Sequence, residues 1–194
     1  MDYKRARKNW IRLYRGTYKA EYNFLDPITF ITKYASKIRW AKSICEIGMG
    51  QGDLLGYLYN RYPNKEYSGV DLNPDILNIL NGFPDSNITI EQTGKYLKNI
   101  EGTVDAIISH CHLMYYPIDS AIKVCNLMSE KANKYILIKE ILMESDYEEN
   151  DYETYFKYGF GRDYSDMFEG FVLKESEVEV VNNIEYQSYL FKKI

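Results

Sequence analysis

The sequence lacks any apolar run long enough to cross a membrane. No stretch approaches 18 consecutive apolar residues, so no transmembrane helix is expected. The basic start of the chain, MDYKRARKNW, is not followed by the apolar segment of a secretory signal. These two absences predict a cytoplasmic protein without membrane association.

Cysteine is scarce as well. The chain has three cysteines, Cys45, Cys111 and Cys125, which are widely spaced and form no CxxC motif. An odd number at such spacing does not support a disulfide scaffold, and free thiols packed in a core are the simpler interpretation. The sequence also has no internal repeat and no low-complexity linker. Its 194 residues, 45% hydrophobic and 27% charged, are typical of one globular domain spanning 1–194.

Charge is unevenly distributed along the chain. Residues 1–42 carry eleven Lys and Arg against three Asp and Glu, a net charge of +8, which leaves −12 for the rest of a chain whose total is −4. Most of this acidic excess lies in 144–179. An acidic total makes a nucleic-acid partner unlikely, although the basic N-terminal segment keeps that partner open.

Strands and helices are expected to alternate over the middle of the chain. Short apolar runs predict strands over 43–48, 66–72, 87–92, 104–110 and 134–142. Helical spacing or composition predicts helices over 53–62, over 74–80 and from about Ile118 to Ser129. This alternation indicates βαβ units and a mostly parallel sheet with both faces covered.

The two ends of the chain differ from this pattern. The N-terminal 42 residues are predicted to form a helical cap, with a helix start at Asp26-Pro27 followed by apolar residues at helical spacing. Residues 176–194 predict two strands that turn around Asn182-Asn183 or around Gln187, with no room for a helix between them. We therefore expect an antiparallel hairpin at the edge of the sheet.

The segment EIGMGQGDLL, residues 46–55, has a glycine at every second position: Gly48, Gly50 and Gly52. Glycine loses more backbone entropy on folding than other residues, so three of them need a reason. In open α/β sheets, ligands bind at the carboxyl ends of the strands, where a bare backbone and the N–H groups of a helix start lie exposed. A tight turn without a ligand is the alternative that the glycines alone leave open.

An acidic residue strengthens the ligand interpretation. Asp71 ends the second predicted strand, 19 residues after Gly52. A carboxylate at this place accepts hydrogen bonds from both hydroxyls of a ribose. A helix cap before Pro74 is the alternative role, for which Asn73 is closer. The glycines and Asp71 together indicate a nucleoside site.

The glycine spacing does not meet the dinucleotide fingerprint G-x-G-x-x-G, because the third glycine comes one residue early. The sequence instead resembles the class I S-adenosylmethionine-dependent methyltransferases. Their first motif, an acid followed by x-G-x-G-x-G, is matched by Glu46-Ile-Gly48-Met-Gly50-Gln-Gly52. Their second is matched by Gly69-Val-Asp71-Leu-Asn73-Pro74 and their fourth by Val104-Asp105-Ala-Ile-Ile-Ser109. The resemblance covers roughly residues 40–145 and is specific for the superfamily, not for a substrate.

The resemblance implies a fold and a cofactor. The fold is a Rossmann-like three-layer α/β sandwich, with a mostly parallel seven-stranded sheet, an antiparallel C-terminal hairpin and N-terminal helices. The cofactor is S-adenosylmethionine, with S-adenosylhomocysteine as its product and no metal. Gly48 and Gly50 would contact its amino-acid part with Glu46 nearby, Asp71 would bind the ribose, and Leu72 would pack on the adenine. The full set expected at the cofactor is Glu46, Gly48, Met49, Gly50, Gly52, Asp71, Leu72, Thr93, Ser109 and His110.

One position departs from the family pattern. Many members place an acid after the third strand to bind the adenine amino group, and Thr93 stands near that position here. A hydroxyl or a backbone carbonyl would have to take over the contact.

Methyl transfer needs no catalytic triad, because the cofactor carries the reactive group and the protein supplies position and electrostatics. A base is needed only where the acceptor must lose a proton. Both histidines of the chain lie in SHCHLMYYP, residues 109–117, which should face the transferred methyl group. The candidates for catalysis are His110, Tyr115 and Glu140, with His110 preferred over His112 because it is nearest the strand end. For each of these side chains, packing or capping is the alternative.

The acceptor side is less defined. Candidate substrate-binding residues are Tyr14, Tyr18, His112 and Tyr116. Residues 144–170, rich in Tyr, Phe and acids, are long for a loop and predict a substrate lid, which would suit a cationic acceptor such as an amine. A solvated acidic face, or one that pairs with the basic N-terminal segment, is the alternative.

The sequence thus predicts an enzyme that transfers a methyl group from S-adenosylmethionine to a small molecule, with an amine or a hydroxyl as the candidate acceptor groups. The first alternative is an RNA or protein methyltransferase that docks through its basic segment. The second is a non-catalytic scaffold with the same fold, and a nicotinamide oxidoreductase fits the glycine spacing worse. The sequence does not define an oligomeric state.

Overall fold

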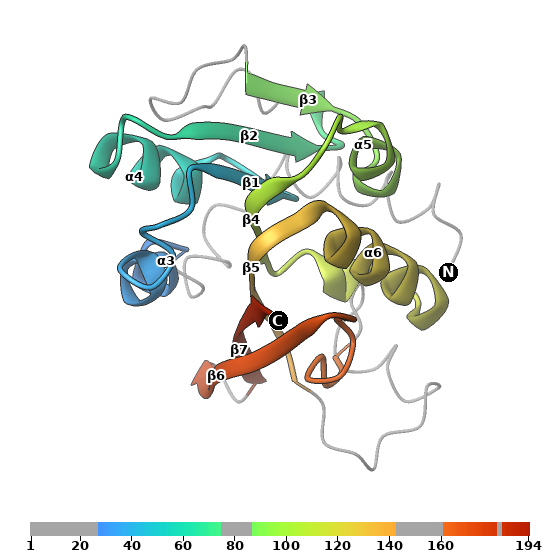
Figure 1. Cartoon of the computed structure of the whole chain (residues 1–194). Coiled ribbons are helices and arrows are strands. Elements are labelled where there is room, and N and C mark those ends of the chain that lie inside the picture. The colour runs from blue at the N-terminus through green and yellow to red at the C-terminus, as the bar shows by residue number, and fades with distance from the viewer. Residues whose placement is uncertain (1–26, 75–86, 143–160, 182–183) are drawn as a thin grey trace.

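The computed structural model describes residues 27–74, 87–142, 161–181 and 184–194. Its centre is one seven-stranded sheet in the order β3-β2-β1-β4-β5-β7-β6 (Figure 1). The first five strands pair in parallel and the last two are antiparallel to their neighbours. The parallel strands are β1 (Ser43–Ile47), β2 (Glu66–Asp71), β3 (Ile88–Ile90), β4 (Val104–His110) and β5 (Ala132–Ile141). The predicted fold class and all five predicted parallel strands are confirmed.

Helices cover both faces of this sheet (Figure 1). Helices α3 (Pro27–Ala35) and α4 (Asp53–Arg61) pack on one face, where Phe30 and Leu55 join a buried cluster with Ile108. Helices α5 (Thr93–Asn99) and α6 (Ile118–Lys131) pack on the other face, where Leu97 and Val124 join a second cluster. In the part of the chain that the structure describes, no helix is long and apolar enough to cross a membrane.

Strand β4 shows how the two faces divide the candidate site. Side chains alternate along a strand, so Ile108 contributes to the cluster under α3 and α4, while Ile107 contributes to the cluster under α5 and α6. The same alternation sends His110 to the α3 face and Ser109 to the α6 face at the carboxyl end of the strand. Two neighbouring candidate residues therefore serve opposite sides of the sheet.

The C-terminal hairpin consists of β6 (Phe171–Val181) and β7 (Ile184–Lys193). Gln187 lies inside β7, paired with Glu140 of β5 and Val178 of β6, so a turn around Gln187 is wrong. Strand β6 also begins five residues before the predicted 176. Its residues are mostly exposed at the sheet edge, and for that reason they carry no buried apolar pattern.

Helix α5 was not expected from the sequence. It has seven residues, and Gly94 at its second position is a weak helix former. Burial of Thr93 and Leu97 against the sheet stabilises this helix, which the helix propensity of its residues alone would not do. The predicted helix at 74–80 lies mostly outside the described residues, as do the predicted cap over 1–26 and 143–160 of the predicted lid.

The described end of the predicted lid, 161–170, packs in the core. Tyr164 is fully buried and Phe168 is nearly so, and the rings of Phe168 and Phe191 lie 4.7 Å apart. The Tyr164 backbone N–H donates to the hydroxyl of Tyr189 at 3.2 Å. These aromatic residues stabilise the α6 face of β7.

A row of ion pairs joins the basic and acidic parts of the chain. Three alternate glutamates on one face of β6 each meet a lysine: Glu175 with Lys37, Glu177 with Lys33 and Glu179 with Lys139. Lys33 lies in α3 and Lys37 just after it. Two lysines of the basic segment, Lys33 and Lys37, therefore pair with glutamates of β6, outside the predicted lid 144–170.

The three pairs should differ in their contribution to stability. The Lys139 side chain is 4% exposed and lies 2.6 Å from a Glu179 oxygen, whereas both partners of the Lys33–Glu177 pair are about half exposed. We expect Glu179→Ala to lower the free energy of unfolding by about 1–3 kcal/mol, because a buried ammonium loses its acceptor. Glu177→Ala should cost less than about 1 kcal/mol. Urea unfolding of both variants tests this, and equal losses would contradict it.

Candidate active site

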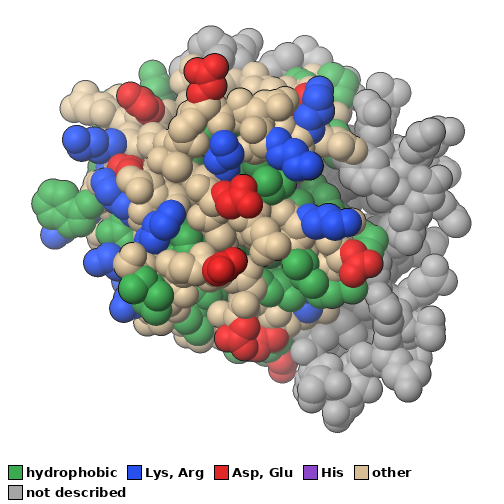
Figure 2. Space-filling view, turned by 45° about the vertical axis from the view of Figure 1, so that its right-hand side comes forward, with side chains coloured by type: hydrophobic (Ala, Val, Ile, Leu, Met, Phe, Trp, Pro, Cys, Tyr) green, Lys and Arg blue, Asp and Glu red, His purple; other side chains and the backbone are tan. Residues whose placement is uncertain are grey.

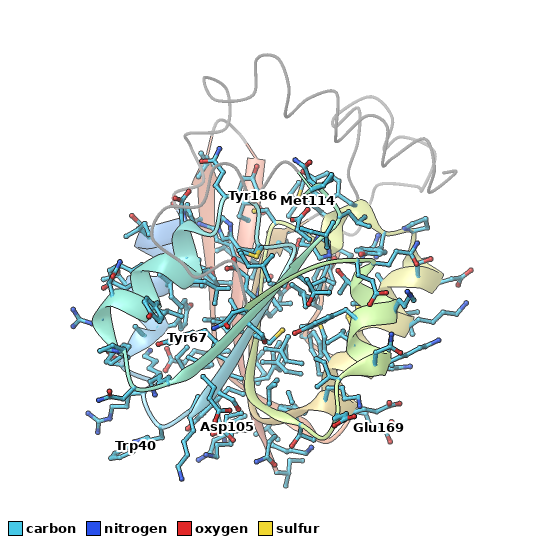
Figure 3. All side chains as sticks on the ribbon, turned by 90° about the horizontal axis from the view of Figure 1, so that it is seen from above. Trp40, Tyr67, Asp105, Met114, Glu169 and Tyr186 are labelled. Atoms are coloured by element: carbon cyan, nitrogen blue, oxygen red, sulfur yellow. The ribbon has the colours of Figure 1, made fainter. Side chains whose placement is uncertain are left out.

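The candidate site lies at the carboxyl ends of the parallel strands. Figure 3 places Met114 and Tyr186 at this end of the sheet and Asp105 at the other. Asp105, the residue of the fourth motif, accepts hydrogen bonds from the backbone N–H of Lys42 at 2.7 Å and from Nζ of Lys134 at 2.8 Å. Asp105 therefore links the segment before β1 to the beginning of β5, at the end of the sheet opposite the candidate site.

The glycine turn connects β1 to α4. Gly48, Gly50 and Gly52 have φ angles of +67°, +55° and +76°, all in the left-handed region. An L-residue would pay about 1–2 kcal/mol at each of these positions. The N–H of Gly48 donates to the carbonyl of Val70 at 2.8 Å, which ties the turn to β2. The turn conformation accounts for all three glycines.

A second constraint acts on Gly48 alone. A Cβ atom added there would lie 2.2 Å from Cγ and Nδ1 of His112. The imidazole of His112 thus lies against the backbone of the glycine turn. The Met49 side chain is buried against Gly69, so Met49 presents only its backbone at the turn.

Asp71 lies beside the same turn. Its Oδ2 accepts the N–H of Gly50 at 3.1 Å and its Oδ1 accepts the N–H of Asn73 at 2.9 Å. Burial raises the pKa of Asp71, and the backbone N–H groups of Asn73, Gly50 and Leu72 partly oppose this shift. A carboxylate has about four acceptor positions, so these backbone N–H groups do not occupy all of them.

Glu46 is a buried acid with an unmet oxygen. It is 3% exposed, and its Oε2 has no hydrogen-bond partner among the described residues. Burial raises its pKa well above the usual value, against the effect of the Leu55 backbone N–H. Such an oxygen is costly unless a donor reaches it, so this position fits a ligand that brings an N–H or an ammonium group.

His112 connects the glycine turn to α5 and to Tyr116. Its Nε2 lies 2.9 Å from Oγ1 of Thr93 and 3.1 Å from the hydroxyl of Tyr116. Burial lowers the pKa of His112 to about 4, so the ring is neutral near pH 7. An unprotonated Nε2 has one lone pair and accepts from one of the two hydroxyls, whereas in the other tautomer the Nε2 proton is donated to one of them.

The remaining predicted residues divide between two places. Ser109 is fully buried and its hydroxyl donates to Oε1 of Glu140 at 2.8 Å. Tyr115 packs near Met114 in a small apolar cluster. His110 lies on the α3 face, with its ring 5.3 Å from that of Phe30. His112, by contrast, lies against the glycine turn at Gly48. Tyr14 and Tyr18 lie outside the described residues.

Three residues of the site were missed from the sequence. Phe30 packs on His110, and Arg162 donates through Nη2 to the carbonyl of Tyr116 at 2.8 Å. Cys111 adopts φ +53°, the one positive value found for a non-glycine residue in the described parts of the chain. Neither a cysteine in a left-handed conformation nor a contact across the sheet leaves a signal in the local sequence.

A groove of about 590 Å³ runs between α5 and α6 and reaches Tyr116. Its rim carries Lys95, Lys98, Lys123 and Glu130. Figure 2, turned so that this side of the molecule comes forward, shows Lys and Arg interspersed with Asp and Glu. Among the residues that the structure describes, no cluster of three His, Cys, Asp or Glu side chains is arranged to hold a metal ion.

Replacement of Gly48 should cost more than replacement of a glycine with the same backbone but free space. Gly170 has φ +76° and nothing within 4 Å of an added Cβ. Gly170→Ala should therefore lose only about 1 kcal/mol, from the left-handed alanine. Gly48→Ala should lose about 1–3 kcal/mol more, because the His112 ring must move. Urea unfolding measures both; equal losses would refute the close contact.

The low pKa of His112 predicts a pH-dependent stability. The unfolded chain takes up a proton near pH 6.5, while the folded ring does so only at about 4. This contribution to stability is present above pH 6.5 and is lost as the pH falls from 6.5 to 4. Relative to His112→Gln, the wild-type protein should lose about 2 kcal/mol between pH 7 and pH 5. Urea unfolding at both pH values tests this, and a constant difference would contradict it.

The sequence matches no protein-family model and no curated protein. Solved structures do match. The N-methyltransferase NodS from Bradyrhizobium japonicum WM9, in complex with S-adenosylhomocysteine, aligns with a TM-score of 0.73 and 9% identity over 97% of this chain and 98% of its own. The magnesium protoporphyrin IX methyltransferase ChlM from Synechocystis PCC 6803, with bound S-adenosylhomocysteine, aligns with a TM-score of 0.67 and 12% identity, over 96% and 93%.

A third match is a S-adenosylmethionine-dependent methyltransferase from Archaeoglobus fulgidus, with a TM-score of 0.62 and 15% identity over 89% of this chain and 100% of the other. All three identities are low, so the likeness is one of fold. The chain has the fold of S-adenosylmethionine-dependent methyltransferases.

Proposed function

We propose that this chain is a S-adenosylmethionine-dependent methyltransferase with a small-molecule acceptor. The observation that carries the proposal is the glycine turn, left-handed at three alternate positions and bonded through Gly50 to the carboxylate of Asp71. A turn that only reversed the chain would need no acid of β2 beside it. The fold shared with solved methyltransferases supports the same conclusion.

The residues of the site fit this cofactor. The free acceptor positions of Asp71 suit the two ribose hydroxyls, and the unmet oxygen of Glu46 suits the ammonium of the methionine part. We expect the chain between them to lie along the backbone of the glycine turn, and Leu72 to pack on the adenine. When bound, the cofactor supplies a sulfonium methyl group for in-line displacement.

The adenine contact is the least usual part of the site. Thr93 stands where many similar enzymes have an acid, and its hydroxyl already contacts His112. If Thr93 donates its proton to Nε2 of His112, its oxygen still accepts a bond. The adenine amino group is a donor and suits that oxygen.

In the reaction, the residues of this chain position the acceptor and take up its proton where one must be lost. A neutral imidazole accepts a proton from an acceptor hydroxyl or ammonium. His110, at the carboxyl end of β4 and beside Phe30 of α3, is the histidine we propose for this role. An acceptor that is already deprotonated needs no base at all.

A small-molecule acceptor is preferred over RNA or a protein surface. Lys33 and Lys37 of the basic segment already pair with Glu177 and Glu175 and are less available to a polyanion. The names of the similar structures point the same way, since NodS is an N-methyltransferase and ChlM methylates magnesium protoporphyrin IX. A cytoplasmic location stays a prediction of the sequence.

The first test is thermal unfolding with S-adenosylhomocysteine, S-adenosylmethionine and NADH in separate samples. A ligand at about 100 times its dissociation constant adds roughly 2.7 kcal/mol, which raises the melting temperature by several degrees. We expect a rise with the first two and none with NADH. Asp71→Ala should abolish the rise, because the ribose loses its acceptor.

The matched control is Asp119→Ala, which removes an exposed acid in the first turn of α6 and should leave the rise intact. No rise with either sulfur compound would refute the proposed function. A rise that survives in Asp71→Ala would refute the ribose role of Asp71 alone.

A further inference from the structure

Glu140 ends β5 behind the turn that follows β4. It is fully buried, and its carboxylate accepts four hydrogen bonds. Oε1 accepts the Ser109 hydroxyl at 2.8 Å and the backbone N–H groups of His112 and Leu113 at 3.1 and 3.0 Å. Oε2 accepts the N–H of Met114 at 3.1 Å.

These donors belong to a turn that has little other support. Leu113–Tyr115 is a single 3₁₀ turn, and the first N–H groups of such a turn have no partner within it. Cys111, just before it, has φ +53°, a strained value for a residue with a side chain. The N–H of Cys111 donates to the carbonyl of Lys139 at 2.8 Å. Glu140 and its neighbour Lys139 thus hold the turn from one strand.

The shape of this turn decides where His112 lies. The His112 backbone is bonded to Glu140, and its ring reaches Gly48, Thr93 and Tyr116. A change in the turn would therefore move a side chain that forms part of the wall beside the glycine turn. Ser109, whose hydroxyl is also taken by Glu140, would move with it.

We propose that Glu140 is a positioning residue for the cofactor site: it shapes the turn 111–114 so that His112 closes against the glycine turn. Glu140 itself contacts no acceptor, because it is fully buried and four donors occupy its oxygens. This inference rests on the proposed function only in assigning the glycine turn to the cofactor. It replaces the catalytic role that the sequence suggested for Glu140.

The chain offers a direct readout, because His110 and His112 are its only histidines. We would follow both imidazole rings by nitrogen-15 NMR during a pH titration. In the wild-type protein His112 should titrate at about 4. In Glu140→Gln an amide N–H faces the donor of Met114, the turn changes, and the titration of His112 should move toward 6.5. The dissociation constant of S-adenosylhomocysteine, from calorimetry, should rise at least about tenfold.

Glu177→Gln is the matched control, since it neutralises a glutamate of β6 that lies on the α3 face with Lys33 and should leave both histidine titrations unchanged. If Glu140→Gln does not fold, Glu140→Asp takes its place, because a shorter side chain withdraws the carboxylate from the turn and should move His112 in the same direction. Single His110→Asn and His112→Asn variants assign the two signals.

Loss of methyl transfer with an unchanged His112 titration and unchanged S-adenosylhomocysteine affinity would overturn the proposal, because Glu140 would then act on the acceptor directly. Failure of the proposed function looks different: the wild-type protein would bind no S-adenosylhomocysteine. The His112 titration would still test whether Glu140 shapes the turn.

Discussion

The close approach of the His112 imidazole to the backbone of Gly48 is the constraint on which the candidate site depends. It joins the turn after β4 to the turn after β1, two segments about sixty residues apart in sequence. Gly48 is required twice, once by its left-handed φ and once by the ring beside it. On the other side of that ring, the hydroxyls of Thr93 and Tyr116 fix its orientation, so one side chain links two strand ends, α5 and the segment between β4 and α6.

The two faces of the sheet have different roles in the candidate site. On the α5 and α6 face, Ser109, Glu140 and His112 are committed to one another through hydrogen bonds. On the α3 face, Glu46 keeps an oxygen without a partner among the described residues, and His110 is flanked by Phe30. A side chain whose hydrogen bonds are all taken by the protein can position, while one with an unmet polar atom can bind. The alternation of side chains along β1 and β4 is what makes this separation possible.

The features that the sequence predicts here are those that depend on local patterns. The parallel strands follow from short apolar runs, and the glycine turn and Asp71 follow from residue type and spacing. The contact of His112 with Gly48 could not be predicted in this way, because it depends on the left-handed backbone at Cys111 and on a carboxylate from another strand. Helix α5 and the start of β6 were missed for a related reason: Gly94 and the exposed edge residues take their structure from tertiary contacts that no local pattern records.

Part of the uneven charge of the chain forms ion pairs within the described residues. Lys33 and Lys37 bind glutamates of β6, and this brings α3 over the antiparallel edge of the sheet. The same helix carries Phe30, whose ring lies against His110 at the carboxyl end of β4. Exposed ion pairs add little free energy each, but these two, one in α3 and one just after it, restrict where that helix can lie. The described part of the basic segment thus helps to place one wall of the site.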